Sequence, residues 1–470
     1  MAKITQKPDA ATRLGTESVV RLLLRFSVPA ILGMLVNALY NVVDRIFVGR
    51  GVNETALGGL ALVMPLMTIS FAFAMLFGIG SANMISVRLG QGKRGEAVRA
   101  LNMGFFLLFF AGLVIMCVEL VGIDFFLSLL GAQDGSVSIQ YARRYYRIIL
   151  YGHVFQMIGF GMSHCTRAQG FPLMTMTSML IGAGMNMILD PVFIFVFGWG
   201  VEGAAWATII SQLASAIFIV TFARSKKAVV RLDFRGFRPS LSVALQIMTF
   251  GSAPCLLQFA MSAVQLIFNW SMSRYGAATL GVANGGDIAL SGMNIIQSLA
   301  MLILMPVFGI NQGAQPILGY NYGAKNFARV RHAYLLAILG ATLICVTGWV
   351  AAFGFPRLLV RLFAPAGSAA LLDFTPRALR LSLLMTPING FQVVSANFFT
   401  VTGRPKISSF LALLRQVILL IPCMVLFGNL WGLYGCAAAM PTADFIACAV
   451  TGAMILRELG RLKRAMGGAL

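Results

Sequence analysis

Long apolar segments, separated by short polar ones, run through almost the whole chain of 470 residues. Because a helix of about 20 apolar residues crosses the hydrocarbon core of a bilayer, each segment predicts one spanning helix. Twelve segments can be placed, near residues 22–48, 56–82, 99–121, 141–165, 172–197, 203–223, 244–272, 281–308, 331–353, 378–401, 406–427 and 432–456. The pattern predicts an all-α membrane protein with twelve transmembrane helices.

The twelve segments form two similar halves. F-S-V-P at 26–29 matches F-G-S-A-P at 250–254 with one insertion, and T-R-A-Q-G-F-P at 166–172 matches T-V-T-G-R-P at 400–405. Six spans per copy is an even number, so both halves enter the membrane from the same side and suit two lobes that rock around a cavity. The predicted domains are an N-tail (1–21), an N-lobe of spans 1–6 (22–223), a basic linker (224–243), a C-lobe of spans 7–12 (244–456) and a C-tail (457–470).

Composition supports a membrane protein and changes the meaning of its charge. Apolar residues make up 59% of the chain and charged residues 11%, against about 45–50% and 25% in soluble domains. A net charge of +21 would favour nucleic-acid binding in a soluble chain. Here most Lys and Arg lie between apolar runs. They are concentrated in the two tails and in the loops that lie on the same side of the membrane as the N-terminus. We therefore expect both termini in the cytoplasm and anionic lipids, not nucleic acid, around the basic residues.

Motifs for catalysis or ATP use are missing from the sequence. G-K-R-G at 92–95 lacks the Ser/Thr and the spaced glycine of a phosphate-binding loop, and neither H-E-x-x-H nor G-x-S-x-G occurs. The seven cysteines form no C-x-x-C pair and lie in or beside apolar runs, which indicates small core residues. We expect no enzymatic activity and no cofactor, so that an ion gradient would drive any transport.

Asp190 lies in an apolar segment that is long enough to cross a bilayer. A charge at that depth costs roughly 3 kcal/mol or more. Asn186 lies one turn earlier on the same helical face, and Pro191 lacks the N–H that would bond the carbonyl of Met187. A carboxylate, an amide and a freed carbonyl can form a proton or hard-cation site; the alternative is that the polar pair only joins neighbouring spans. Thr208, eighteen residues later in the next span, can return to the same depth.

The first span carries a polar stripe at three- and four-residue steps. Its members are Asn37, Tyr40, Asn41 and Asp44. Such a stripe faces protein or a water-filled cavity rather than lipid. The alternative for Asp44 is an interfacial ion pair with Arg45 or Arg50.

The acidic positions are not repeated in the second half. Alignment of Pro191 with Pro422 places Asp190 over Ile421, and alignment of the first proline pair places Asp44 over Asn269. This asymmetry favours a role of the two aspartates in coupling over a role in general packing.

Other titratable residues are weaker candidates. Glu119 and Asp287 fall near span ends, where snorkelling lowers the cost of a charge, while Asp444 lies well inside the last span as a secondary candidate. His153 and His164 can titrate near neutral pH, but a lone membrane histidine is more often a packing donor.

Adaptable apolar side chains and prolines complete the candidates. The chain has 26 Met and 36 Phe, which suit the binding of flat cations. We expect Met179, Asn37, Tyr40 and Asn41 to line a substrate cavity. Pro29 and Pro191 are candidates for bending their helices; the alternative for Pro29 is an ordinary proline at a helix start.

The sequence resembles the multidrug and toxic compound extrusion (MATE) transporters, in particular a bacterial branch with MepA-like and DinF-like members. The matching stretches are V-D-R-I-F-V-G-R (43–50), N-M-I-L-D-P (186–191), G-I-N-Q-G-A-Q-P-I-L-G-Y-N-Y-G-A (309–324) and R-Q-V-I-L-L-I-P (415–422). The resemblance implies a twelve-spanning exporter of cationic aromatic compounds in the bacterial cytoplasmic membrane, which works by antiport with H⁺ or Na⁺. We expect the protein to be monomeric.

The resemblance also implies which residues couple transport to the ion. Members of this branch use an aspartate in span 1 and an asparagine, an aspartate and a threonine in spans 5 and 6. These roles transfer to Asp44, Asn186, Asp190 and Thr208, where Na⁺ would bind if it is the coupling ion. Another branch uses acidic residues in spans 7 and 10, which contain no Asp or Glu here. Between H⁺ and Na⁺ the sequence does not decide: several oxygens can hold sodium, whereas desolvation of a carboxyl favours a proton.

Two other functions stay open at this point. A flippase for lipid-linked precursors would share the two-lobe plan, but it would be expected to carry more basic residues in its cavity. A channel or sensor without coupling would not accumulate substrate against a gradient in sealed vesicles.

Overall fold

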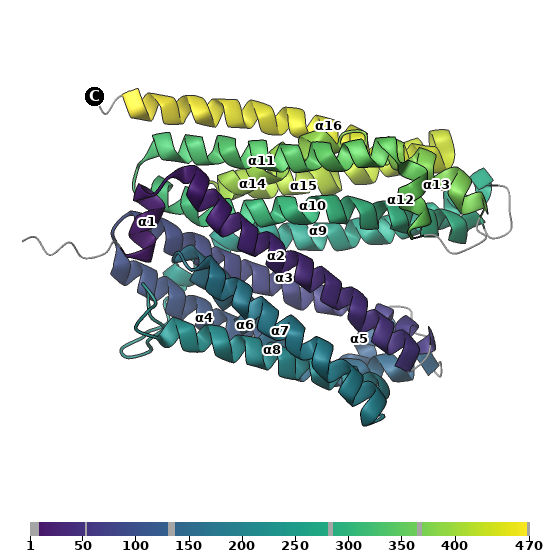
Figure 1. Cartoon of the computed structure of the whole chain (residues 1–470), viewed down its shortest axis with the longest axis horizontal. Coiled ribbons are helices and arrows are strands. Elements are labelled where there is room, and N and C mark those ends of the chain that lie inside the picture. The colour runs from purple at the N-terminus through teal and green to yellow at the C-terminus, as the bar shows by residue number, and fades with distance from the viewer. Residues whose placement is uncertain (1–8, 52–53, 130–136, 281–284, 364–368, 468–470) are drawn as a thin grey trace, which may run out of the picture. The chain divides into compact units, whose positions relative to one another are not determined.

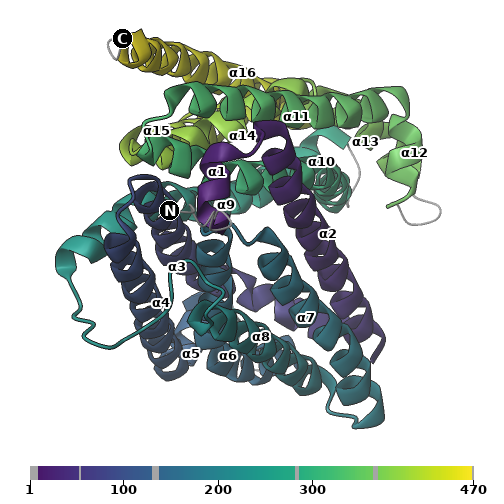
Figure 2. The ribbon, with the colours of Figure 1, turned by 60° about the vertical axis from the view of Figure 1, so that its left-hand side comes forward.

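The computed structural model describes residues 9–51, 54–129, 137–280, 285–363 and 369–467. Within these ranges the chain is helical and forms no β-strand (Figures 1 and 2). The helices of the first half are α1 (Ala10–Thr16), α2 (Val19–Gly51), α3 (Glu54–Gly90), α4 (Arg94–Val121), α5 (Ile123–Leu129), α6 (Val137–Ala168), α7 (Pro172–Pro191), the π-helix η1 (Val192–Val196) and α8 (Gly200–Arg224). Those of the second half are α9 (Leu241–Leu280), α10 (Gly285–Gly323), α11 (Phe327–Gly354), α12 (Pro356–Arg361), α13 (Ala369–Ser382), α14 (Thr386–Val401), α15 (Pro405–Leu413), the π-helix η2 (Leu414–Leu420) and α16 (Ile421–Gly467).

The described helices account for all twelve predicted spans. Among the described residues, nine stretches are long and apolar enough to cross a membrane, the last of them running from Pro405 to Arg464. That stretch contains two spans, because Gly432 (φ 59°) breaks the helical conformation inside α16. The other two spans are α6, which is 32 residues long but less apolar, and the pair α13 and α14.

The same turn starts the fifth span of each half. Gly170 (φ 102°) precedes α7 and Gly403 (φ 75°) precedes α15, and in both places the helix begins at a proline two residues later. Glycine adopts this left-handed conformation without a steric penalty, and proline is preorganised for the first position of a helix. The repeat seen in the sequence thus encodes a repeated turn.

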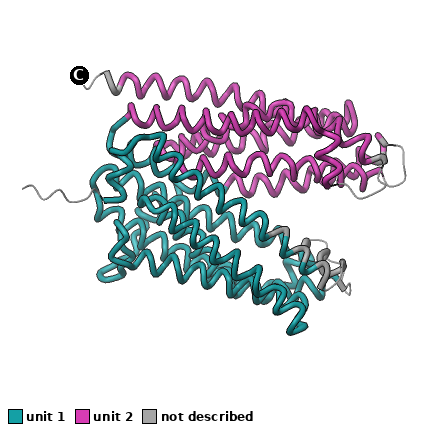
Figure 3. Tube along the Cα trace, in the orientation of Figure 1, with its two compact units in different colours: residues 1–255, 315–326 teal, residues 256–314, 327–470 magenta. Residues whose placement is uncertain are grey.

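The chain divides into two compact units (Figure 3). Unit 1 comprises residues 1–255 and 315–326, and unit 2 comprises residues 256–314 and 327–470. The predicted lobes had a single boundary in the linker at 224–243. In the structure the first part of α9 and the last part of α10 belong to unit 1 instead.

Close packing of backbones explains where the boundary lies. A Cβ atom at Gly80 of α3 would collide with the backbone of α9, and one at Gly251 of α9 would collide with the backbone of α3. In the same way, a Cβ atom at Gly90 of α3 would collide with the backbone of α10, and one at Gly323 of α10 with that of α3. Helices that touch through glycines approach more closely than side chains would allow. The ends of α9 and α10 are therefore built into unit 1.

Replacement of Gly323 with Ala is expected to destabilise unit 1 by about 1–3 kcal/mol, because the new methyl group overlaps the carbonyl oxygen of Val87. Thermal unfolding of the purified protein measures the effect. Gly452→Ala is the matched control, since a Cβ at that helical position would meet nothing within 4 Å and alanine favours the helix. Equal unfolding temperatures for the two variants would show that the close approach carries no stability.

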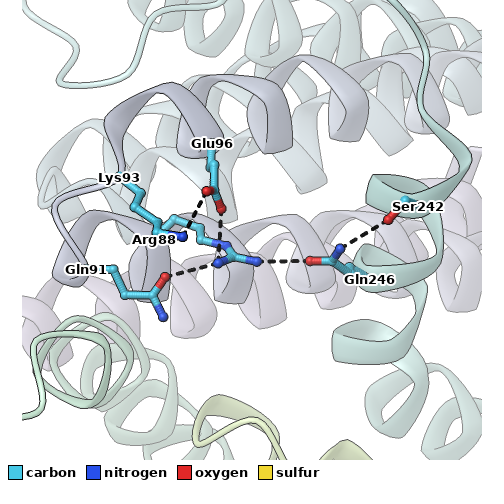
Figure 4. Close-up of polar contacts among 6 residues, drawn as sticks. All are labelled: Arg88, Gln91, Lys93, Glu96, Ser242 and Gln246. Carbon is cyan, nitrogen blue, oxygen red and sulfur yellow. Dashed lines mark hydrogen bonds and ion pairs between the residues drawn. The ribbon is translucent and has the colours of Figure 1, made fainter.

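Polar contacts reinforce the same junction (Figure 4). Arg88 at the end of α3 donates to Gln246 of α9 at 3.1 Å and to Gln91 at 3.0 Å, and it forms an ion pair with Glu96 at 3.0 Å. Lys93 also pairs with Glu96, at 3.0 Å. Because these groups are partly exposed, the network orients the α3–α4 turn against α9 more than it stabilises the fold.

The basic linker is a packed part of unit 1. The backbone N–H of Val230 donates to the side chain of Gln169 at 2.9 Å, and that of Asp233 donates to Asn102 at 3.2 Å. Val230 and Leu232 are buried. The basic side chains are exposed: Arg224, Lys226, Lys227, Arg231, Arg235 and Arg238.

Candidate functional site

The predicted site residues come from helices that pack together in unit 1. Helix α7 packs against α2 and α8, and α6 packs against α3, α4 and α8. Ser178 and Ser215 fix the register of α7 against α8, since each hydroxyl donates to the other residue's carbonyl oxygen, at 3.1 and 3.0 Å. In this antiparallel register Asn186 and Thr208 lie opposite each other.

Asn186, Asp190 and Thr208 form a buried polar group between α7 and α8. The amide nitrogen Nδ2 of Asn186 lies 3.4 Å from Asp190 Oδ1 and 3.3 Å from Thr208 Oγ1. The exposed fractions are 2% for Asn186, 0% for Asp190 and 6% for Thr208. The one-turn spacing of Asn186 and Asp190 produces the first contact, and the antiparallel return of α8 produces the second.

Helix α2 adds a second carboxyl group to this site. Asp44 is in hydrogen-bonding contact with Asp190, and Tyr40, one turn earlier on α2, is hydrogen-bonded to Thr208. Tyr145 of α6 lies close enough to interact electrostatically with both carboxyl groups. Tyr145 was not among the predicted residues, because a tyrosine beside several arginines is typical of an interfacial aromatic belt.

The contact of the two carboxyl groups limits what the site can hold. Two ionised carboxylates at such close range repel each other, so a proton or a bound cation between them is favoured. Asp190 forms no ion pair with a Lys or Arg among the described side chains. Its Oδ2 atom and the Oδ1 atom of Asn186 are buried, and neither has a hydrogen-bond partner among the described residues. The oxygens fit a proton or Na⁺, both of which are hard acids.

The other predicted cavity residues have mixed positions. Asn37 is exposed on α2, and Met179 of α7 packs against Gly33 of α2. The side chain of Asn41 lies outside the described residues, as do those of Arg45 and Arg50, the alternative partners of Asp44. Their roles stay predictions.

The two prolines lie in different helical surroundings. Helix α2 continues through Pro29, whereas α7 ends at Pro191 and changes directly into the π-helix η1. Short π-helical segments often occur at functional sites, because they shift the register of the side chains that follow. Bending at either proline stays a prediction.

Asp444, the secondary candidate, has an ion-pair partner in unit 2. Its Oδ1 atom accepts a hydrogen bond from Arg415 Nε at 2.6 Å, and its Oδ2 atom accepts one from Asn389 at 2.9 Å. Arg415 lies in η2, the π-helix of the second half. The charge of Asp444 is therefore balanced within unit 2, unlike that of Asp190.

Glu119 does not snorkel to the interface as its place near a span end predicted. Its exposed fraction is 4%, because Tyr146 of α6 covers the end of α4 and bonds the carboxyl group. Asp287, in contrast, is exposed in the first turn of α10.

Comparisons with known proteins show what the whole chain is similar to. The MatE family model matches residues 29–192 and 254–426, one stretch in each half of the chain. The multidrug export protein MepA of Staphylococcus aureus (strain MRSA252) is 24% identical over 438 residues, which cover 93% of each protein. MepA of Staphylococcus saprophyticus is 23% identical over 93% of this chain and 94% of its own length.

Solved structures show the same fold. One, described as the outward-facing conformation of a multidrug resistance MATE family transporter of the MOP superfamily, is 25% identical and covers 98% of this chain and 100% of its own, with a TM-score of 0.89. This likeness confirms the predicted all-α membrane fold of twelve transmembrane helices in two lobes. The MatE family model matches a stretch in each half and so confirms the resemblance drawn from the motifs. The chain therefore belongs to the MatE family of transporters.

Proposed function

We propose that this chain exports cationic, aromatic compounds by antiport with H⁺ or Na⁺. The observation that carries the proposal is the contact between Asp44 and Asp190 in a buried site. The names of the relatives, multidrug export proteins, agree with this function.

The chemistry of the site supports an exchange of one cation for another. When its proton or Na⁺ leaves, the site is left with negative charge in a medium where the Coulomb attraction of an organic cation is several times stronger than in water. A returning ion neutralises that charge and weakens the hold on the drug. Asp44 and Asp190 would carry the charge, and Asn186, Thr208 and Tyr40 would orient the two carboxyl groups.

The same charges argue against a flippase for anionic lipid-linked precursors. Such a transporter needs cations in its binding cavity. The site in unit 1 has two carboxyl groups, and the arginine of η2 is already paired with Asp444.

Transport into sealed proteoliposomes tests the proposal. A fluorescent organic cation is the substrate, and the pH gradient and the sodium gradient are imposed separately. We expect accumulation against the substrate's own gradient with at least one of them. Equilibration without accumulation under both gradients would favour a channel or sensor and contradict antiport.

We further propose that the protein works as a monomer in a bacterial cytoplasmic membrane with both termini in the cytoplasm. The exposed basic side chains of the linker would then face anionic lipid headgroups. The positive-inside rule supports this orientation.

The orientation can be tested by cysteine labelling in cells. Lys227→Cys, in a background where the exposed Cys117 is replaced by Ser, should react with a membrane-impermeant maleimide only after the cells are opened. Asp287→Cys, exposed at the start of α10, should react in intact cells. The reverse labelling pattern would invert the topology and the direction of export.

A further inference from the structure

A second buried polar cluster lies between α3, α4 and α6 in unit 1. Tyr146 donates a hydrogen bond to Glu119 Oε2 at 2.9 Å. His153 Nδ1 lies 3.5 Å from the same Glu119 oxygen and 3.1 Å from Ser70 Oγ. The exposed fraction is 4% for Glu119 and 0% for the other three side chains.

This cluster is separate from the site on α2, α7 and α8. Helix α6 contributes to both: Tyr145 interacts electrostatically with Asp190, and its neighbour Tyr146 bonds Glu119. Adjacent residues on a helix point about 100° apart. The two clusters therefore lie on different faces of α6.

The surroundings of His153 decide where a proton is held. An imidazolium ion carries an N–H on both nitrogens and needs two acceptors. The Nε2 atom of His153 is buried and has no hydrogen-bond partner among the described residues. An ion pair of imidazolium and carboxylate would thus bury an unsatisfied charged donor, which costs more than a neutral pair.

Nearby charges do not compensate an ionised Glu119. Among its described side chains, helix α3 contributes only Ser70 to the cluster, and helices α5 and α8 hold their acidic groups in ion pairs with α6 at the surface. The charged groups of these surroundings are Arg143 with Asp124 at 2.7 Å, Arg144 with Glu202 at 4.0 Å, and the exposed Arg147. Among the described side chains no Lys or Arg forms an ion pair with Glu119.

We propose that Glu119 is a second proton-binding site of this chain, whose carboxyl group holds a proton at neutral pH beside a neutral His153 and releases it in alkaline solution. Release leaves a negative charge between α4 and α6 with one hydroxyl donor, Tyr146. This site does not depend on antiport or on the ion bound at Asp190. The N-lobe would thereby have two separate places for a proton.

Infrared spectroscopy of the purified full chain in lipid nanodiscs tests the proposal directly. We expect a carboxylic acid C=O band at neutral pH that disappears reversibly in alkaline solution and is absent from Glu119→Gln. Asp190→Asn should keep this band, as should Glu202→Gln, an exposed-carboxylate control. The band should also move to higher frequency in Tyr146→Phe, because this variant removes the hydroxyl group that donates to the acid.

Two results would overturn the inference. The first is an unchanged spectrum in Glu119→Gln at neutral pH, which would show that Glu119 is ionised there. The second is a Glu119 band that persists across the whole pH range in which circular dichroism shows folded protein, because the acid would then bind no exchangeable proton. If Glu119→Gln does not fold, Tyr146→Phe makes the assignment, and absence of any band shift in it contradicts the proposal.

Discussion

Replacement of Asp190 with Asn is expected to reduce coupled export to the level of vesicles without transporter. The amide has nearly the shape of the carboxyl group, so the packing of α7 against α2 and α8 should be kept. It cannot, however, carry the negative charge that attracts a cation, nor take up a proton when the substrate leaves. The loss should therefore concern transport and leave membrane insertion and unfolding temperature close to those of the wild type.

Proteoliposome uptake with matched amounts of protein measures this loss. Asp287→Asn is the control, because it makes the same chemical change at an exposed carboxyl group in the first turn of α10, and it should transport at the wild-type rate. Undiminished gradient-driven uptake by well-folded Asp190→Asn would remove Asp190 from the coupling mechanism.

A second expected result is that the coupling ion and the drug weaken each other's binding. Since both neutralise the same carboxyl groups, a lower pH or a higher sodium concentration should lower the affinity for an organic cation. If one ion is exchanged per drug, each tenfold rise in the ion's concentration lowers the affinity by up to about tenfold, and linkage makes the effect reciprocal. Protonation neutralises the carboxylate that binds the drug, so the affinity for the drug falls as the pH is lowered.

Fluorescence titration of the purified protein with the drug at several pH values and sodium concentrations checks this dependence. Asp190→Asn should flatten it, while Asp444→Asn should leave it intact. Because Asp444→Asn also deprives Arg415 of its partner, the charge-balanced variant Arg415→Gln/Asp444→Asn is the better control. An affinity that is flat in both titrations of the wild type would rule out direct competition and leave only an effect of the ion on the conformational equilibrium.

Much of the architecture could be predicted from the sequence, because it depends on residues that are close together along the chain. Length and hydropathy predict spanning helices, and the one-turn spacing of Asn186 and Asp190 defines a contact within one helix. A short antiparallel connection carries Thr208 back to the same level. The Gly-x-Pro turns at Gly170 and Gly403 encode the internal repeat in the same local way.

Contacts between distant segments could not be predicted in this way. Nothing in the pattern shows that Gly80 and Gly251 bring α3 and α9 into backbone contact, so there was no sign in the sequence that the first part of α9 and the last part of α10 group with unit 1. The burial of Glu119 depends on Tyr146, 27 residues away. The partner of Asp444, Arg415, lies in another span and could be placed beside it only by the structure.

The central claim is that drug binding displaces a cation from the Asp44–Asp190 site. It is tested most directly by measuring the ions released when a saturating organic cation is added to the purified protein. Proton release is measured in weakly buffered solution and sodium release with a sodium-selective electrode. We predict that the wild type releases one of the two ions in proportion to the drug bound, and that Asp190→Asn releases neither. Drug binding by the wild type without release of either ion would contradict the account.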